Sequence, residues 1–161
     1  MDKETFMIIR KVHEIFKKKG LKLSVAESCT GGLISHYITL LPGASAFFEA
    51  GVVTYSAESK MKILGLSSDT ISSYGVISKE TAGEMAERMR LLTKTGCAVS
   101  TTGNLGPDVL ERKDIGLIYT AVSMNGKTFV RELRLNGKRE EIKERAAVSA
   151  LEFLIEVISN R

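Results

Sequence analysis

The segment Glu27-Ser28-Cys29-Thr30-Gly31-Gly32 carries the side chains best suited to covalent chemistry. It follows a short apolar run that is predicted as a strand and precedes one that is predicted as a helix. Backbone N–H groups at such a corner have no partner inside the helix, so they suit a phosphate or a developing oxyanion. The two glycines allow a close approach without a Cβ clash. Ser28 is then a candidate nucleophile. The alternative is a tight turn in which Ser28 and Thr30 only cap the helix.

Lys60 is a candidate general base for that serine. Ser56 is predicted to cap a short helix that ends at Gly65, which places Lys60 near the first turn. The helix dipole disfavours positive charge there, and burial would also lower the pKa of the amine. A neutral lysine can activate a serine without a histidine. Taken alone, Lys60 is better explained as an exposed helical lysine. Only its combination with Ser28 predicts a Ser-Lys dyad, and the nearby Lys62 is expected to be solvated.

The two cysteines are predicted to be inert. A thiol needs an adjacent base or cation to become a reactive thiolate, and the sequence places none beside Cys29. We expect Cys29 to be a small buried side chain, and Cys97, inside a predicted strand, to be another.

Two further segments are candidates for binding a substrate. A predicted strand ends in the loop Thr101-Thr102-Gly103-Asn104-Leu105-Gly106-Pro107, which either holds a polar group or is simply a polar loop. Basic residues near the C-terminus alternate with glutamates, so most are expected to form a solvated, ion-paired surface, with one or two free to contact a phosphate. These residues are Arg131, Arg134, Lys138, Arg139, Lys143 and Arg145.

Several kinds of site are disfavoured by the sequence. It contains no Walker loop, HExxH, CxxC or GxSxG motif, and its 2 Cys and 2 His make a zinc cage or a disulfide scaffold improbable. His13 and His36 have no partner in sequence and are expected at the surface or its boundary, which disfavours a Ser/His/Asp device. The net charge of +4 is compatible with an anionic partner. A nucleic-acid site would need a cleaner basic stripe with stacking aromatics, so nucleic acid is not an expected partner.

These candidates are carried by a chain of 161 residues, the size of one domain, which we assign to residues 1–161. No apolar stretch resembles an export signal or a membrane span, so we expect a soluble cytoplasmic protein.

Helices are predicted at 2–19, 33–41, 56–64, 79–93 and 139–159, with Gly96 stopping the fourth. Strands are predicted at 21–26, 51–55, 97–102, 115–124 and 127–135, whereas 67–77 is polar and turn-rich. Asn125-Gly126 predicts a type I′ hairpin, so one pair of strands must be antiparallel. The expected fold is a three-layer α/β/α domain on a mixed sheet.

The motifs taken together resemble the CinA C-terminal domain family, whose enzymatic members are nicotinamide-nucleotide amidohydrolases. The resemblance covers nearly the whole chain after the first predicted helix, in order and without large gaps. It is carried by AESCTGGL at 26–33, LPGASAFFEAGVVTYSAESKMKILG at 41–65, GVISKETAGEMA at 75–86, TTGNLGP at 101–107 and NGKREEIKERAAVSALEFL at 136–154.

The resemblance implies a fold like that of anticodon-binding domains and an activity in pyridine nucleotide salvage. That activity is hydrolysis of the carboxamide of nicotinamide mononucleotide to nicotinic acid mononucleotide and ammonia, without a metal or cofactor. It implies Ser28 as the nucleophile and Lys60 as its base, with backbone amides near the glycine corner or near Gly103 holding the oxyanion. It also implies a homo-oligomer, with a dimer the expected form. The residues expected to bind substrate are Glu27, Thr30, Gly31, Gly32, Tyr55, Thr102, Gly103 and, at the phosphate, Arg139.

Segment 104–114 departs from the family pattern. The family enzymes carry a longer glycine-rich stretch followed by a proline, and Asn104-Leu105 replaces a pair of small apolar residues. Lys138 stands where an aspartate is common. Because this segment is expected to border the substrate, the alternative hypothesis is a catalytically inactive nucleotide- or partner-binding module. The chain is expected to be a stand-alone version of the domain, without the separate N-terminal domain of longer relatives.

Overall fold

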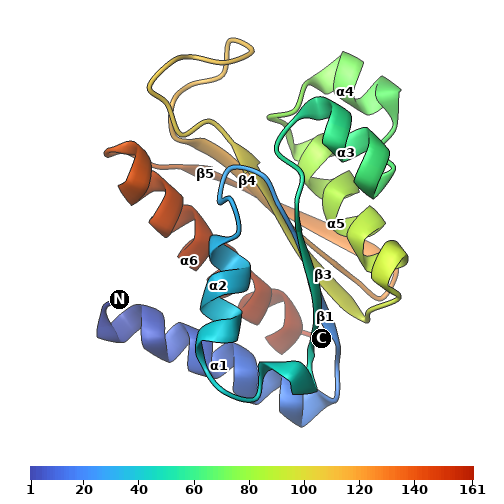
Figure 1. Ribbon diagram of the computed structural model, residues 1–161, viewed down its shortest axis with the longest axis vertical. Helices are drawn as coiled ribbons and strands as arrows, with labels where there is room; N and C mark the ends of the chain where they lie inside the picture. Colours follow the sequence, from blue (N-terminus) through green and yellow to red (C-terminus); the bar gives the residue numbers. More distant parts are fainter.

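The computed structural model describes residues 1–161 and is built on a mixed sheet of five strands in the order β2-β1-β3-β4-β5 (Figure 1). The strands are β1 (Leu23–Glu27), β2 (Phe48–Val53), β3 (Cys97–Gly103), β4 (Leu117–Met124) and β5 (Lys127–Arg134). β1 pairs in parallel with both β2 and β3, whereas β4 is antiparallel to β3 and to β5. The carboxyl ends of β1, β2 and β3 therefore meet at one edge of the sheet, which is where α/β proteins place ligands.

Helices cover both faces of this sheet (Figure 1). α1 (Lys3–Lys19), α2 (Leu33–Leu40) and α6 (Arg139–Ser159) pack together on one face. α3 (Ala57–Leu64), α4 (Ser68–Tyr74) and α5 (Lys79–Thr93) form the layer on the other face. A short 3-10 turn, η1 (Ala44–Ala46), precedes β2. The predicted three-layer α/β/α fold on a mixed sheet is confirmed. No helix is long and apolar enough to cross a membrane.

Most element ends follow the local signals in the sequence. The side chains of Ser56 and Ser78 cap the N-termini of α3 and α5, and Asp2, which was predicted to lie inside the first helix, caps α1. Asn125 and Gly126 have φ values of 54° and 72°, which confirms the type I′ turn between β4 and β5. β2 begins at Phe48, earlier than the predicted residue 51, because the strand partner of Leu23 lies there.

Three predictions were wrong. The polar segment 67–77 contains the helix α4, which Ser67 caps and which packs on α5. Helix α5 ends at Thr93 with Lys94 in the left-handed conformation, so Gly96 is not its stop. His13 is buried and not at the surface, because its Nε2 lies 2.8 Å from the carbonyl oxygen of Ile38 and its ring packs on Phe47. His36 is exposed, in line with its prediction.

The main hydrophobic core lies between the sheet and the α1/α2/α6 layer, and a smaller core lies beneath α3 and α5. β1 and β3 are buried on both faces, which explains why their sequences contain few charged residues and no regular alternation of polar and apolar side chains. The ends of these two strands are consequently rigid platforms for the loops that follow them.

Gly116, at the entrance to β4, is a position where the backbone tolerates no side chain. Its φ is +85°, and a Cβ added there would collide with the carbonyl oxygen of Leu135. Gly126 also has a positive φ, of +72°, but a Cβ there would meet nothing within 4 Å. We predict that Gly116→Ala lowers the free energy of unfolding by at least about 3 kcal/mol, from overpacking and the left-handed backbone together.

The matched control is Gly126→Ala, which carries only the backbone cost of about 1–2 kcal/mol. Urea unfolding followed by circular dichroism measures both. Equal losses in the two variants would contradict the steric explanation.

Candidate active site

The corner between β1 and α2 is organised by the carboxylate of Glu27, which is completely buried. Its oxygens accept hydrogen bonds from the amides of Gly32 (3.0 Å), Ile34 (3.1 Å) and Ser35 (2.8 Å). They also accept bonds from the hydroxyls of Thr30 (2.6 Å) and Ser35 (2.9 Å). Since the N-cap residue Gly32 has no side chain, Glu27 reaches back from the strand to satisfy the free amides of α2. The structure thus places Glu27 beneath the corner, where it fixes the path of the chain around Ser28.

The same corner is also hydrogen-bonded to the neighbouring strand β3. The hydroxyl of Thr30 lies 2.7 Å from that of Thr101, and the amide of Ser28 donates to the carbonyl oxygen of Thr101 at 3.1 Å. Gly31 and Gly32 both adopt positive φ values, of 59° and 99°, which allow the chain to turn from the strand into the helix. Ser28 is therefore fixed from below by Glu27 and from the side by β3.

Lys60 projects from α3 to the same place. Its Nζ lies 2.8 Å from Ser28 Oγ and also donates to the carbonyl oxygens of Thr54 (2.6 Å) and Tyr55 (3.3 Å). Lys60 is 0% exposed and Ser28 is 7% exposed. A capping box of Ser56 and Ser59 fixes the start of α3 and so sets the direction of the lysine. The two residues that the sequence pairs as a dyad are in direct contact, although 32 positions separate them.

Burial controls the charge of Lys60. Loss of hydration lowers the pKa of its amine from 10.5 to about 8, and the weaker field of the Glu111 carboxylate acts in the opposite direction. A neutral amine has two hydrogens and one lone pair. The carbonyls of Thr54 and Tyr55 accept the two hydrogens, which leaves the lone pair facing the hydroxyl of Ser28. This arrangement can remove a proton from the serine as it attacks an electrophile.

Neighbouring reactive groups do not compete with this pair. Burial raises the pKa of the Cys29 thiol to about 12, and it does the same for Cys97, so both are the buried, protonated thiols that the sequence predicts. Lys62 is exposed, as predicted, and it forms an ion pair of 2.6 Å with Glu58.

Two backbone amides of the corner are left without acceptors in the protein. The amide of Gly31 donates to Ser28 O at 3.1 Å and that of Gly32 donates to Glu27, so neither glycine is free. The amides of Cys29 and Thr30 donate to no backbone carbonyl. They sit next to the serine, where donors for an oxyanion are required.

The chain around this dyad can be compared with known proteins. The family model of the CinA C-terminal domain matches residues 6–158. The chain belongs to this family. A provisionally named competence-damage inducible protein of Caldanaerobacter subterraneus subsp. tengcongensis is 42% identical over 151 residues, which is 93% of this chain and 37% of that protein. A CinA-like protein of Kosmotoga olearia is 42% identical over 144 residues, 89% of this chain and 35% of its own length. The CinA domain described here thus spans just over a third of these curated relatives.

Solved structures of the CinA superfamily share the fold. The superfamily protein of Klebsiella pneumoniae aligns with a TM-score of 0.95 at 26% identity, over 98% of this chain and 99% of the other. The competence/damage inducible protein of Agrobacterium tumefaciens aligns with a TM-score of 0.92 at 34% identity, over 97% and 96% of the two chains.

Basic side chains of the CinA domain border the corner. Arg139 donates to the carbonyl oxygen of Gly106 and to Tyr55 Oη, the latter at 2.9 Å. Tyr55 is 60% exposed, so this pair is open to solvent. Lys143, one turn along α6, has its Nζ 3.2 Å from the position that a Cβ on Gly31 would occupy. Arg131 and Arg134 belong to the ion-paired surface that the sequence predicts. Arg131 pairs with Glu156, and Arg134 pairs with Glu132 and Asp114.

Two further residues that were predicted to bind substrate, Thr102 and Gly103, make contacts that hold the fold together. The hydroxyl of Thr102 donates to the carbonyl oxygen of Val76 at 2.6 Å, so it connects β3 to the segment before α5. Gly103 packs closely under Ile118, because a Cβ there would collide with that side chain. The structure does not bring the Thr102 hydroxyl into contact with Ser28 or Lys60.

Sequence reasoning did not anticipate the contacts of segment 104–116. The side-chain amide of Asn104 holds the base of this segment, and the carboxylate of Glu111 accepts bonds from the amides of Val76 (2.9 Å) and Ile77 (3.2 Å). No local pattern predicts a contact between residues 34 and 35 positions apart.

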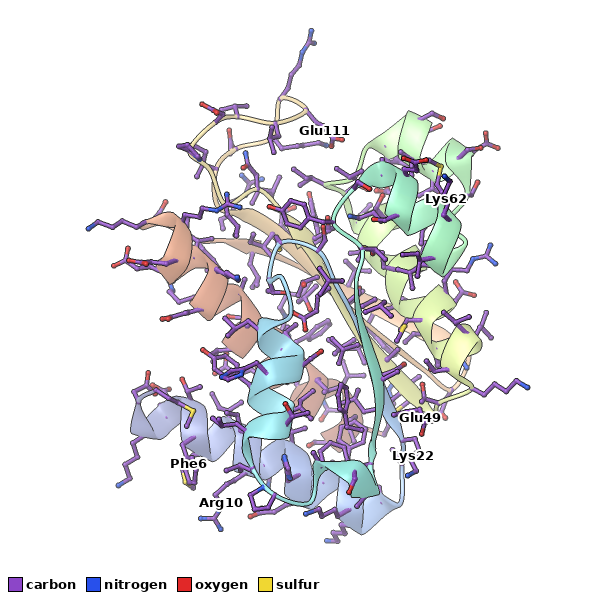
Figure 2. The ribbon with its side chains drawn as sticks, viewed as in Figure 1. Phe6, Arg10, Lys22, Glu49, Lys62 and Glu111 are labelled. Carbon is purple, nitrogen blue, oxygen red and sulfur yellow. The ribbon has the colours of Figure 1, made fainter.

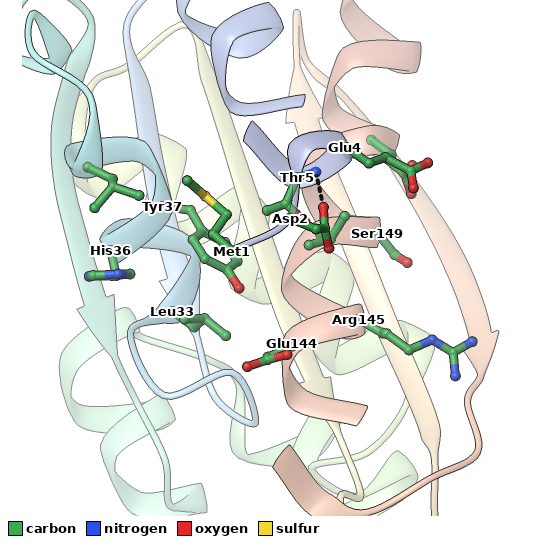
Figure 3. Close-up of a pocket in the computed structure, with 13 residues that line it drawn as sticks. Met1, Asp2, Glu4, Thr5, Leu33, His36, Tyr37, Glu144, Arg145 and Ser149 are labelled. Carbon is green, nitrogen blue, oxygen red and sulfur yellow. Dashed lines mark hydrogen bonds between the residues drawn. The ribbon is translucent and has the colours of Figure 1, made fainter. Parts of the chain in front are cut away.

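A pocket of about 650 Å³ lies away from the dyad, between the start of α1, α2 and α6 (Figure 3). Asp2, Leu33, Tyr37, Glu144 and Arg145 are among its lining residues. Of the candidates from the sequence, only the basic residue Arg145 and the exposed His36 line it, and neither Ser28 nor Lys60 does. The CinA domain contains no group of three or more His, Cys, Asp or Glu side chains arranged to hold a metal ion.

We predict that Glu27→Gln destabilises the CinA domain by at least about 3 kcal/mol. An amide cannot accept all the bonds made by the buried carboxylate, and its NH2 group would face donors. Thermal and urea unfolding measure the loss.

Glu49→Gln is the matched control, since Glu49 is an exposed glutamate on β2, and it is expected to change stability by less than about 0.5 kcal/mol. A Glu27→Gln protein as stable as this control would refute the anchoring role.

Proposed function

We propose that this CinA domain is a Ser-Lys amidohydrolase that converts nicotinamide mononucleotide to nicotinic acid mononucleotide and ammonia. The observation that carries the proposal is the 2.8 Å contact between Ser28 Oγ and the fully buried Nζ of Lys60. A lysine buried beside a serine, without a carboxylate partner, is costly for stability and is explained by a need for a neutral amine. Membership of the CinA family supports the choice of substrate.

In the first half of the reaction, Ser28 Oγ attacks the carboxamide carbon while Lys60 Nζ takes the serine proton. The oxyanion that forms is held by the unpaired amides of Cys29 and Thr30. Lys60 then returns the proton to the departing nitrogen, ammonia leaves, and an acyl ester remains on Ser28.

In the second half, water attacks the ester carbonyl. Lys60 accepts a proton from the water as its oxygen bonds to the carbonyl carbon, and it returns that proton to Ser28 Oγ as the ester bond breaks. The products are the free nicotinic acid nucleotide and the regenerated serine. Because Lys60 is neutral at the start of each half-reaction, it acts as base and then as acid in both.

The phosphate of the substrate suits the basic border of the corner. Arg139 and Lys143 lie on one face of α6, four residues apart, and Lys143 faces Gly31. Neither forms an ion pair with a carboxylate, so their charges are free for an anionic group.

A second candidate is a catalytically inactive module that binds a nucleotide or a partner. It is favoured by segment 104–114, which differs from the family pattern and whose Glu111 accepts hydrogen bonds from the amides of Val76 and Ile77. An inactive module would be stabilised by nicotinamide mononucleotide without releasing ammonia.

The proposal predicts ammonia release from nicotinamide mononucleotide by the wild-type protein, measured with a coupled glutamate dehydrogenase assay. Ser28→Ala is expected to lower kcat by about 10³-fold or more, and Lys60→Met by about 10²–10⁴-fold, because each removes a group that acts in the transition state.

Lys62→Met is the matched control, since Lys62 is an exposed lysine on the same helix, and its activity should equal that of the wild type. Thermal unfolding checks that each variant is folded. A wild-type protein that binds the nucleotide but releases no ammonia would reject the amidase in favour of the inactive module.

The rate is also expected to depend on pH through Lys60. Since the base must be neutral and its pKa is about 8, kcat/KM should rise with pH below about 8 and level off above it. A pH profile of kcat/KM between pH 6 and 10 measures this limb. A profile that is flat across pH 7–9 would argue against a lysine base.

A further inference from the structure

Segment 104–116, which joins β3 to β4, is rigidly held at its base. Asn104 Nδ2 donates to the carbonyl oxygens of Asp108 (3.0 Å) and Lys113 (3.3 Å), and Asn104 Oδ1 accepts from the amide of Gly106 (2.8 Å). One side chain thus connects the outgoing and returning limbs. In Figure 1 the segment rises above the carboxyl edge of the sheet, on the same side as the start of α6 and the α3/α4 layer.

The tip of the segment is attached to a distant part of the chain by Glu111. Its two carboxylate oxygens accept bonds from the successive amides of Val76 and Ile77, directly before the cap of α5. Gly75 leaves room for this carboxylate, because a Cβ there would collide with it. Figure 2 shows the Glu111 side chain extending from the segment toward the layer of α3 and α4.

The backbone at this tip is strained. Glu111 and Arg112 have φ values of 53° and 57°, and two successive residues with side chains in the left-handed region are unfavourable for L-amino acids. Such strain persists only where surrounding contacts impose it, and it concentrates at functional segments. Here the two residues form the centre of a tight turn, which the amide of Lys113 closes by donating to the carbonyl oxygen of Leu110 at 2.7 Å. The two bonds of the Glu111 carboxylate hold this turn against Val76 and Ile77.

The segment therefore connects both sides of the Ser28–Lys60 site. On one side Arg139 binds Gly106 O and also Tyr55, whose carbonyl oxygen accepts from Lys60. On the other side Glu111 binds the strip before α5, and Thr102 ties that strip to β3. With both attachments made, Ser28 is 7% exposed.

We propose that segment 104–116 is a lid over the Ser28–Lys60 site and that Glu111 is the positioning residue that latches it shut. The existence of the latch is independent of the reaction, whereas its effect on catalysis rests on the proposed amidase. Substrate entry then requires the carboxylate to leave the amides of Val76 and Ile77.

The latch also places a negative charge within electrostatic range of the lysine. Glu111 favours the protonated form of Lys60 and so opposes the effect of burial on its pKa. The neighbouring Cys29 thiol adds no charge, because burial raises its pKa to about 12. Removing the charge of Glu111 should therefore lower the pKa of Lys60 further.

Limited trypsin digestion tests the latch, because Arg112 and Lys113 lie at its tip. We expect Glu111→Ala to be cleaved after these residues at least about tenfold faster than the wild type, with cleavage sites identified by mass spectrometry. The matched control is Asp108→Ala, an exposed acid on the same segment whose side chain makes no hydrogen bond, and it should be cleaved at the wild-type rate. Equal cleavage of Glu111→Ala and the wild type overturns the lid, whatever the activity.

The pH profile of ammonia release tests the positioning role. Glu111→Gln keeps an acceptor oxygen but no charge, so its rising limb should move to lower pH than that of the wild type. If the rising limb of the Glu111→Gln profile stays at the wild-type pH, Glu111 does not influence the pKa of Lys60. A wild-type protein that releases no ammonia refutes the amidase, and the trypsin result then still decides whether the latch exists.

Discussion

The structure depends on a buried carboxylate that takes the place of a helix cap. Glu27 belongs to β1, yet its oxygens bind the first amides of α2 and two hydroxyls. The negative charge is stabilised by the N-terminal end of the helix dipole, so it needs no cationic partner. Because the strand, the corner and the helix share this one group, Ser28 has little freedom to move. Without it, the serine would lie on an ordinary glycine-rich turn.

Lys60 depends on that rigidity. Its amine is removed from water and is compensated only by two carbonyl oxygens and the serine hydroxyl, so a small displacement of Ser28 would leave a polar group without a partner. The dyad is thus produced by two adjacent parallel strands, β1 and β2, which end side by side and feed the corner and α3 respectively.

Features set by neighbouring residues could be predicted from the sequence. The caps Asp2, Ser56 and Ser78 and the Asn125-Gly126 turn act over two to four residues, and amphipathic spacing marks α1 and α5. The helix α4 was not predicted because five of its seven residues are small and polar and none is fully buried. Only its cap and its packing on α5 indicate a helix there. The burial of His13 and the contact of Glu111 with Val76 depend on elements far apart in the chain. For the same reason local signals offered Ser28 and Lys60 only as two separate candidates, and motif resemblance supported their pairing. The anchoring role of Glu27 was found only in three dimensions.

The depressed basicity of Lys60 comes from dehydration and not from a dedicated charged neighbour. The apolar packing around the amine therefore sets its pKa. Looser packing admits water and raises the pKa of the lysine, whereas tighter packing lowers it. Relatives with the same two reacting side chains can in this way differ in the acidity at which they work best. Evolution could adapt such a catalyst to a new cellular environment through substitutions that touch neither reacting atom.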